Sequence, residues 1–304
     1  MSISKAIVPV AGLGTRLLPT TKALPKEMLP VGRQPVIHHV VEELAAAGIR
    51  QILFVTGGNK SAIEDHFDEN SELVRRLAAD EHDMLAACSF GFRERGIEFF
   101  SVRQRILPGQ TKPAGTGAAV AAGQTFVGDE PFVVAFGDSI VRTMAGDPLL
   151  QRMVASHLDH NSTCTIGAYE VADELMHHYG ILVPETAGVA DARLIDILEK
   201  PKPDQTSSRL AISARYVFSA AIFPQISQLT PSPSGEFYLT DAIAALISMG
   251  SMVRAVRLGR DEKRCDIGNH LAYFETFVDY ALNDPEWGAQ IRAYMREKSA
   301  GDRS

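Results

Sequence analysis

The chain is poor in cysteine. Cys88, Cys164 and Cys265 are widely scattered and have no C-x-x-C spacing. This spacing argues against a disulfide framework and against the usual cysteine signature of a redox or metal site. We therefore expect reduced, structural cysteines in a cytosolic protein.

The sequence also lacks a long apolar run. No stretch approaches 18 apolar residues, so no segment is expected to span a membrane. The apolar segment after Lys5 is interrupted by Pro9 and by glycines, and Arg16 follows too soon for a signal peptide. These features predict a soluble, cytoplasmic protein.

Positive charge is not in excess either. The chain has 30 Lys and Arg against 37 Asp and Glu, a formal net charge of -7. Proteins that bind nucleic acid show concentrated basic patches, so the charge balance argues against a nucleic-acid partner. It does not argue against a small anionic substrate, because the basic residues needed there are few and local. At 304 residues and 45% hydrophobic content, the chain can bury a large core.

The most informative segment begins at the first predicted strand, Ala6–Val10. The strand runs into a glycine loop, residues 11–16, with the sequence AGLGTR. A glycine loop at a strand end lets backbone N–H groups approach phosphates that side chains would otherwise block. Arg16, Lys22 and Lys26 follow within a few residues. Together these features predict a polyanion site, with a nucleoside triphosphate as the expected ligand.

Two familiar glycine-loop motifs are absent. The chain has no G-x-x-x-x-G-K-[ST], which excludes a P-loop. Leu17 stands where a dinucleotide fingerprint needs a third glycine, and the strand at 51–56 ends in Gly57-Gly58 instead of an acidic residue. A nicotinamide-dependent oxidoreductase is therefore disfavoured. A bare G-x-G is typical of an ordinary strand-to-helix turn, but Arg16 and Lys26 beside it favour nucleotide binding.

Hydrophobic periodicity predicts alternating strands and helices and an opening strand–helix–strand unit, which is typical of parallel sheets. The expected strands are 6–10, 49–56, 99–104, 131–136, 163–170, 194–198, 215–218 and 253–258. The expected helices are 35–47, parts of 61–88, 118–124, 241–249 with Thr240 as N-cap, and a region from about 271. A Gly- and Pro-rich loop is expected at 107–117.

These elements predict an α/β fold that is Rossmann-like, with a mostly parallel mixed β-sheet flanked by helices and with inserted β-hairpins. Residues 1–270 are expected to form one α/β domain. Residues 271–304 are expected to form peripheral or oligomerising helices with a polar tail.

Further motifs follow the first loop in a fixed order. They are Val102-Arg103-Gln104, Gly115-Thr116-Gly117, Asp138, Tyr179-Gly180, Glu199-Lys200-Pro201, GEFYLTDAI at 235–243 and DIGN at 266–269. The ordered set, over roughly residues 5–285, resembles the sugar nucleotidyltransferases, particularly the bacterial UTP–glucose-1-phosphate uridylyltransferases. KEMLP at 26–30 together with LTDAI at 239–243 resembles the uridylyl branch.

This resemblance implies a fold of the nucleotide-diphospho-sugar transferase type. It also implies that UTP and glucose 1-phosphate react to UDP-glucose and pyrophosphate, with Mg²⁺ as cofactor, in a homodimer or homotetramer. Both reacting groups are anionic, so the catalysis is expected to depend on positioning and electrostatic stabilisation.

The resemblance also assigns the nucleotide site. Arg16 is expected to contact the triphosphate, and Lys26 is expected near the α-phosphate or the attacking phosphate. The amide of Gln104 suits the imide edge of uracil, with backbone groups around it. The residues expected to bind the nucleotide are Ala11, Gly12, Gly14, Thr15, Gln104, Gly117 and Asp138.

A second set is assigned to the sugar phosphate and the metal. Lys200 is the expected counter-ion of the phosphate, and Glu199 the expected acceptor for sugar hydroxyls. Gly180 would leave room for the hexose, with Glu236 or Asp241 lining the same pocket. The expected Mg²⁺ ligands are two carboxylates at strand ends, Asp138 and Asp266.

Some alternatives remain open at this stage. Gly137 stands before Asp138 where the family usually has proline, and the loop at 105–114 is longer than usual. The same reaction with dTTP or another sugar 1-phosphate is therefore a rival. A non-catalytic regulatory paralogue is a weaker one, because such relatives lose the Thr-Arg pair that is intact here. His157 and His160 have metal-ligand spacing but no third partner, so a helix surface is expected for them.

Overall fold

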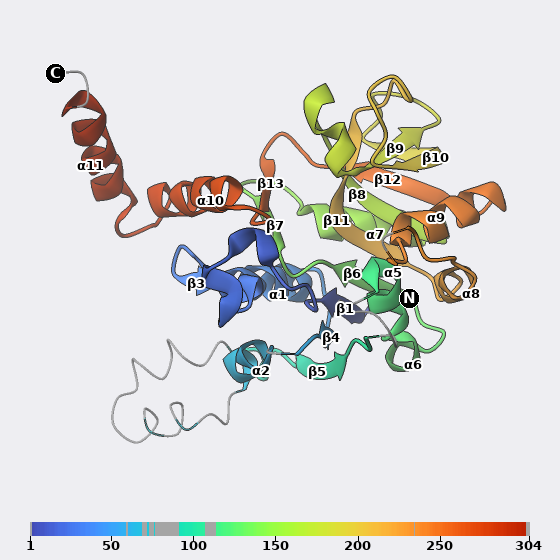
Figure 1. The fold of residues 1–304 in the computed structure, drawn as a ribbon, viewed down its shortest axis with the longest axis horizontal. Helices are drawn as coiled ribbons and strands as arrows, with labels where there is room; N and C mark the ends of the chain where they lie inside the picture. The colour runs from blue at the N-terminus through green and yellow to red at the C-terminus, as the bar shows by residue number, and fades with distance from the viewer. Residues whose placement is uncertain are drawn as a thin grey trace.

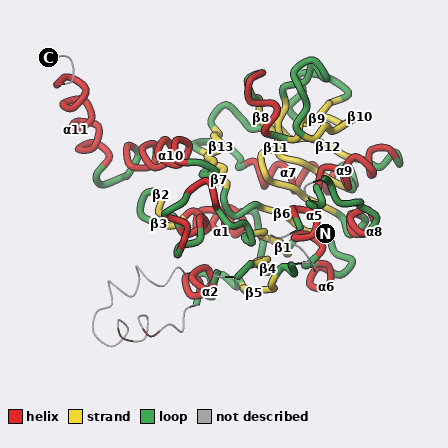
Figure 2. The backbone as a smooth tube through the Cα atoms, in the orientation of Figure 1, coloured by secondary structure: helices red, strands yellow, loops and turns green. Residues whose placement is uncertain are grey.

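The computed structural model describes residues 2–58, 60–68, 72, 76, 91–106, 114–233 and 235–301. In this part of the chain a nine-stranded sheet runs through the molecule, with helices on both of its faces (Figure 1). Two helices at the carboxyl end extend away from the sheet, and the C-terminus lies far from the N-terminus (Figure 2).

The central sheet is mixed but mostly parallel. In spatial order its strands are β5 (Glu98–Arg103), β4 (Gln51–Thr56), β1 (Lys5–Pro9), β6 (Phe132–Ala135), β11 (Leu210–Phe218), β8 (Cys164–Glu170), β12 (Val253–Arg257), β10 (Asp191–Glu199) and β9 (Gly180–Pro184). Among these described strands, only β10 and β11 run against the others. Because β5, β4, β1 and β6 are parallel, the loops that follow them meet at one edge of the sheet.

Helices cover both faces of this sheet. One face carries α1 (Val36–Ala46), α2 (Ser61–Phe67) and α7 (Leu149–Asp159). The other carries α5 (Gly115–Ala121), α6 (Gln124–Val127), α8 (Ile222–Ser227) and α9 (Leu239–Ser248). Short 3-10 turns lie between them: η1 (Thr15–Leu17), η2 (Thr20–Lys22), η3 (Lys26–Met28) and η4 (Asp173–His178). The arrangement is a three-layer α/β/α fold.

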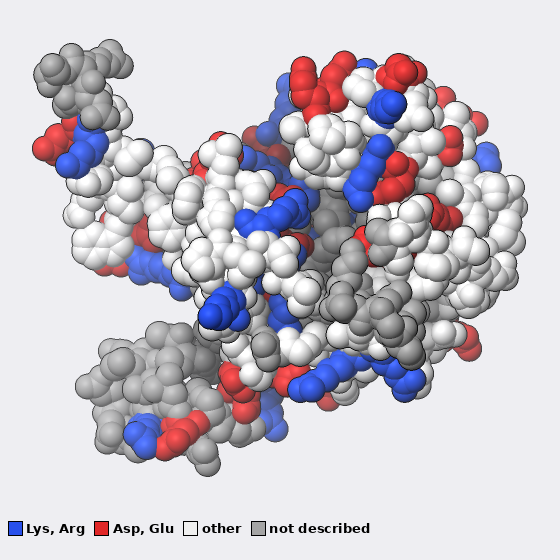
Figure 3. Space-filling view, viewed as in Figure 1, with Lys and Arg blue, Asp and Glu red and all other residues white. Residues whose placement is uncertain are grey.

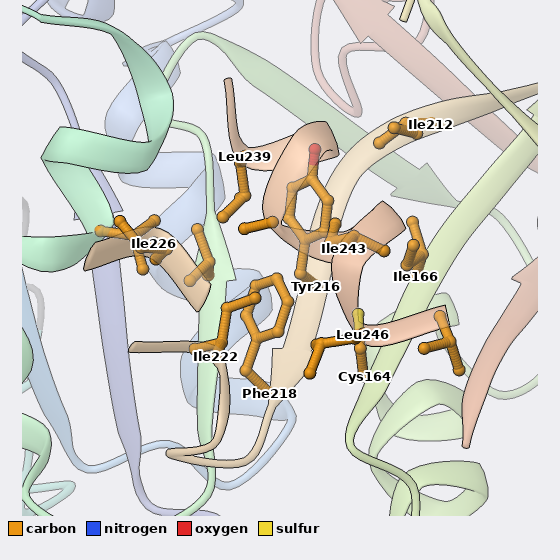
Figure 4. Packing of buried hydrophobic residues seen from close by; sticks show 14 of the residues in the cluster. Cys164, Ile166, Ile212, Tyr216, Phe218, Ile222, Ile226, Leu239, Ile243 and Leu246 are labelled. Carbon is orange, nitrogen blue, oxygen red and sulfur yellow. The ribbon is translucent and has the colours of Figure 1, made fainter. Parts of the chain in front are cut away.

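The central strands of the sheet bury both of their faces. On β6, Phe132 and Val134 belong to one apolar cluster, and Val133 and Ala135 belong to the other. Figure 4 shows the first cluster, in which side chains from the sheet interlock with those of α8 and α9. Successive side chains of a strand point to opposite faces, so a strand between two helix layers is apolar throughout.

Two small ribbons complete the described structure. β7 (Ser139–Thr143) pairs antiparallel with β13 (Glu262–Asp266), and β2 (Pro30–Val31) pairs with β3 (Gln34–Pro35). α10 (His270–Leu282) packs on β13 and β2, and α11 (Gly288–Gly301) follows it and contacts α10. In the described part of the chain, no helix is both long and apolar enough to cross a bilayer.

The predicted fold class is confirmed: the sheet is mixed, mostly parallel and flanked by helices. Each predicted strand corresponds to an observed one, with its ends shifted by a few residues. The inserted hairpin is formed by β9 and β10, which pair antiparallel. Most of the region expected to be helical after α2, the centre of the loop at 107–117 and Cys88 lie outside the described residues.

Two local predictions are wrong. The loop was expected to extend through residue 117, but α5 begins at Gly115. Thr240 is not the N-cap of α9, because that helix begins at Leu239 and Thr240 lies in its first turn. The ribbon of β7 and β13 was not predicted, since the sequence EKRCD of β13 has none of the apolar alternation that marks a strand.

Candidate active site

The site is built at the edge where β4, β1 and β6 end, and the glycine loop follows β1 there. Gly14 has a left-handed backbone, with φ 67°, which favours glycine. Its carbonyl oxygen accepts a hydrogen bond from Thr21 Oγ1 at 2.8 Å. This bond closes the loop, and η1 begins directly after it with Thr15 and Arg16.

Lys26, in η3, forms an ion pair with Asp138, which follows β6. Burial favours a lower pKa for Lys26, but the negative charges of Asp138 and Glu27 outweigh it and raise the pKa above its ordinary value. Burial likewise disfavours the charged form of Asp138, but the ion pair with Lys26 outweighs it and lowers the pKa. Both groups are therefore charged at neutral pH.

Asp266 reaches the same edge through the ribbon of β7 and β13. Ser139, the residue after Asp138, is its register partner. The carboxylate of Asp266 is held at both oxygens: Oδ1 accepts from the N–H of Gly268 at 2.7 Å, and Oδ2 accepts from Arg264 at 2.8 Å. The ribbon thus brings together the two carboxylates that the sequence assigns to a metal.

Arg264 is itself fixed by two tyrosines. Its Nη1 donates to the hydroxyl of Tyr169 at 2.9 Å. The guanidinium lies 5.1 Å from the ring centroid of Tyr169 and 5.5 Å from that of Tyr179. Burial alone would lower the pKa of Arg264, but the charge of Asp266 outweighs it and raises the pKa. The guanidinium of Arg264 is therefore a permanent positive charge beside the carboxylate of Asp266.

A cavity of about 520 Å³ opens beside the glycine loop. Gln104 is 8% exposed, and its Nε2 donates to the carbonyl of Gly115 at 3.1 Å, which fixes the amide plane. Gly117 lies outside the lining, and its N–H donates to the carbonyl of Phe237 at 2.9 Å. The lining contains the other residues predicted for the nucleotide: Ala11, Gly12, Gly14, Thr15, Arg16, Lys26, Gln104 and Asp138.

A second cavity, of about 690 Å³, adjoins the first. It contains the residues predicted for the sugar phosphate together with the second aspartate: Gly180, Glu199, Lys200, Glu236 and Asp266. Residues that line both cavities are Arg16, Thr116, Phe136, Asp138, Glu236 and Tyr238. Asp241 is exposed and lies in neither lining. Lys and Arg side chains border a hollow in this face of the molecule, with Asp and Glu side chains nearby (Figure 3).

Glu199 ends β10, and Lys200 follows it with a left-handed backbone, φ 48°. The Nζ of Lys200 lies 3.1 Å from Glu199 Oε1 and 4.8 Å from the ring centroid of Tyr238. Burial favours a lower pKa for Lys200, but Glu199 outweighs it and raises the pKa. The hydroxyl of Thr240 donates to Glu199 Oε2 at 2.8 Å. A Cβ on Gly180 would lie 2.6 Å from Ile212 Cδ1 and 3.0 Å from Thr240 Cγ2, so only glycine fits against these two side chains.

Several lining residues have no role predicted from the sequence, among them Glu27, Thr116, Phe136, Tyr238 and Arg264. Tyr238 follows Glu236 by two positions, and in an extended segment residues two apart lie on the same side. The spacing could therefore have predicted that Tyr238 lines the cavity together with Glu236. Arg264 had no comparable signal, because its place depends on the pairing of β13 with β7.

The two histidines considered for a metal are not both on a helix surface. His157 is 4% exposed, and its Nδ1 lies 3.2 Å from Thr165 Oγ1. Burial lowers its pKa to about 4. His160 directly follows α7, and its Nδ1 lies 3.0 Å from the carbonyl oxygen of Ser156. Across the residues that the structure describes, no three His, Cys, Asp or Glu side chains are grouped as metal ligands.

Comparison with known proteins identifies the family. Residues 5–283 match the family described as Nucleotidyl transferase, and this chain belongs to it. A UTP–glucose-1-phosphate uridylyltransferase of Bacillus subtilis is 37% identical over 294 residues, which cover 96% of each chain. A structure titled UTP-bound UGPase from Acinetobacter baumannii is 34% identical, covers 97% of this chain and 99% of its own, and superimposes with a TM-score of 0.86. The resemblance inferred from the sequence motifs is confirmed.

A further solved structure, described as UDP-glucose pyrophosphorylase complexed with UDP-glucose, is 30% identical to this chain. It covers 91% of this chain and 98% of its own length, with a TM-score of 0.78. The relatives therefore share the fold over nearly the whole chain, including the segments that form both cavities.

Proposed function

We propose that this protein transfers a uridylyl group from UTP to α-D-glucose 1-phosphate, giving UDP-glucose and pyrophosphate. The observation that carries the proposal is the pair of adjoining cavities. One contains the residues expected at the triphosphate and the other those expected at the sugar phosphate, and Arg16 and Asp138 lie in both linings. The curated relatives named for this reaction support the choice of substrates.

The charges of the two linings suit a reaction between two anions. Lys26 places a buried ammonium in the nucleotide cavity beside Asp138, and Lys200 places a second one in the other cavity beside Glu199. Arg16 lines both cavities. In the proposed reaction Lys26 contacts the α-phosphate or the attacking phosphate, and Arg16 contacts the triphosphate. These cations reduce the repulsion between the substrates and hold the attacking oxygen in line with the α-phosphorus.

Two aspartates fit a magnesium site in which phosphate oxygens of the substrate supply the remaining ligands. Mg²⁺ is usually bound by one or two carboxylates together with phosphate oxygens and water. Asp138 and Asp266 supply two carboxylates at the end of one ribbon. We propose that they hold Mg²⁺, which when bound neutralises charge on the phosphates. Lys26 and Arg264 would orient the two carboxylates through their ion pairs with Asp138 and Asp266.

The proposal includes a cytoplasmic location. Cys164 and Cys265 are buried free thiols, which agrees with a reducing compartment. The predicted assembly into a homodimer or homotetramer through residues 271–304 stays a prediction.

The proposed reaction is tested by pyrophosphate release from the purified chain. A panel of UTP, dTTP and other triphosphates is combined with glucose 1-phosphate and other sugar 1-phosphates, with and without EDTA. The expected result is the highest kcat/KM for UTP with glucose 1-phosphate, and loss of turnover in EDTA that Mg²⁺ restores. Faster turnover of dTTP or of another sugar would favour the rival pair of substrates, and no turnover of any pair would favour a regulatory paralogue.

A further inference from the structure

Directly behind Lys26 lies a second ion pair that has no part in the reaction as described so far. Glu27 Oε2 and Lys60 Nζ are 2.7 Å apart, and the two side chains are only 1% and 7% exposed. Glu27 is the neighbour of Lys26 in η3, and Lys60 immediately precedes α2. Glu27 lines the nucleotide cavity, whereas Lys60 lines neither cavity.

The two ion pairs form a continuous row with alternating charge: Lys60, Glu27, Lys26 and Asp138. The row crosses three loops that follow β4, β1 and β6, which are neighbours in the sheet. The loops are packed closely, since a Cβ on Gly137 would lie 3.4 Å from Glu27 Cγ. Glu27 therefore lies between Lys26 on one side and the segment that holds Asp138 on the other.

Stability alone does not account for such a pair. Two charges lose much of their hydration on burial, and replacing a buried pair with neutral groups of similar shape is often neutral or stabilising. Burial in fact raises the pKa of Glu27 despite the opposing charges of Lys60 and Lys26. What the pair does provide is a fixed negative charge beside the ammonium of Lys26, together with a tether from the start of α2 to η3.

We propose that Lys60 and Glu27 are positioning residues for Lys26. The ion pair fixes η3 so that the ammonium of Lys26 faces Asp138 and the nucleotide cavity, and the charge of Glu27 holds that ammonium in place. This inference rests on the proposed function, in which Lys26 acts close to the reacting phosphates. It assigns to Lys60, which lines neither cavity, an effect on the rate of the chemical step.

Three variants separate positioning from stability. Glu27→Gln keeps an oxygen acceptor for Lys60 but removes the charge. Lys60→Met leaves the carboxylate of Glu27 buried without its partner, so a lower melting temperature is expected. The double variant, with both changes, replaces the charged pair with two neutral side chains and is expected to regain most of that melting temperature.

A matched control is available in Arg254→Met. The Nε of Arg254 lies 2.9 Å from Asp191 Oδ1, in an ion pair between β12 and β10 that lines neither cavity. This variant removes one cation from a partly buried pair and is expected to keep the wild-type kcat.

The measurements are kcat, KM for UTP and melting temperature of each protein, with the substrates that the wild type uses best. All three variants at the Glu27–Lys60 pair are expected to lose about 10- to 100-fold in kcat with KM for UTP near the wild-type value, because misplacement at a reacting centre reduces the chemical step. In the double variant this loss is expected to persist although the melting temperature has recovered.

Two results would overturn the inference. One is a double variant that regains wild-type kcat together with its melting temperature, and the other is Glu27→Gln with wild-type kcat. If the variants containing Lys60→Met do not fold, Glu27→Gln decides the question alone. Failure of the proposed function is recognised separately, because the wild type would then not form UDP-glucose from UTP and glucose 1-phosphate.

Discussion

The backbone N–H of Ile267 donates a hydrogen bond to the carbonyl oxygen of Asp138 at 3.4 Å. This contact continues the pairing of β7 with β13, in which Ser139 lies opposite Asp266. The ribbon holds the two proposed metal ligands on one scaffold, although they are far apart in the sequence. The strand pairing places the two backbones side by side, and ion pairs with Lys26 and Arg264 hold the carboxylates of Asp138 and Asp266.

The first prediction concerns these carboxylates. Asp138→Ala and Asp266→Ala are each expected to reduce kcat by about 100-fold or more, because transition-state charge would lose its stabilising partner. Each variant is expected to keep the fold, as judged by its circular dichroism spectrum. The control is Asp173→Ala, which breaks only an exposed ion pair with Arg209 and should leave kcat unchanged. Near wild-type rates in either site variant would remove that residue from the metal site.

The second prediction concerns Gly115, which begins α5 and lines the nucleotide cavity. Gly115 has φ 90°, and a Cβ there would lie 2.8 Å from the carbonyl oxygen of Phe237. Gly115→Ala is therefore expected to lower the free energy of unfolding by about 1–3 kcal/mol. Urea unfolding measures this change. Gly58→Ala serves as control, because a Cβ on Gly58 meets nothing within 4 Å. Equal stability of the two variants would contradict the observed contact.

The third prediction concerns pH. His157 is buried in the folded protein with its pKa lowered to about 4, whereas its ordinary value is 6.5. The unfolded chain therefore binds the proton at higher pH than the folded one does. The stability that neutral His157 contributes is fully present above pH 6.5 and is lost as pH falls toward 4, by about 1.4 kcal/mol per unit. Below pH 4 the loss levels off.

Unfolding free energies of the wild type and of His157→Gln, measured from pH 7.5 to 4, test this expectation. The variant should be less stable at pH 7.5 and show a shallower decline. A parallel decline in both proteins would mean that other groups account for the acid sensitivity. His38 and His66 are candidates, since burial lowers their pKa values to about 3 and about 4.

The fourth prediction concerns the C-terminal helices. One face of α10 packs on the body through Tyr273 and Tyr280, whereas Leu271, Phe274 and Val278 on its other face are 67%, 57% and 37% exposed. Contiguous apolar surface of this kind marks an interaction site. If residues 271–304 mediate assembly, Phe274→Glu should lower the molar mass measured by light scattering after size exclusion. A wild-type protein that is already monomeric would contradict the predicted assembly.

The sequence by itself determined most strands of the central sheet and the cationic loop. Segments such as Phe132–Ala135 are apolar because both faces are buried, so their pattern is visible without a structure. Gly14 was identifiable because a glycine loop at a strand end lets backbone N–H groups approach phosphates, and Arg16 and Lys26 because they add positive charge beside that loop. Backbone conformation and side-chain charge are local properties. They depend on residues that are close together in the sequence, so a sequence pattern can reveal them.

Only the tertiary structure decided which of these residues meet. The charged segment of β13 adopts a strand conformation because it pairs with β7. That pairing brings Asp266 close to Asp138, and on the same strand Arg264 forms an ion pair with Asp266. The same holds for Lys60, which looks like an ordinary surface lysine until the packing of three loops places it 2.7 Å from Glu27. Such contacts join distant segments, and their energies depend on burial and distance, which no local pattern contains.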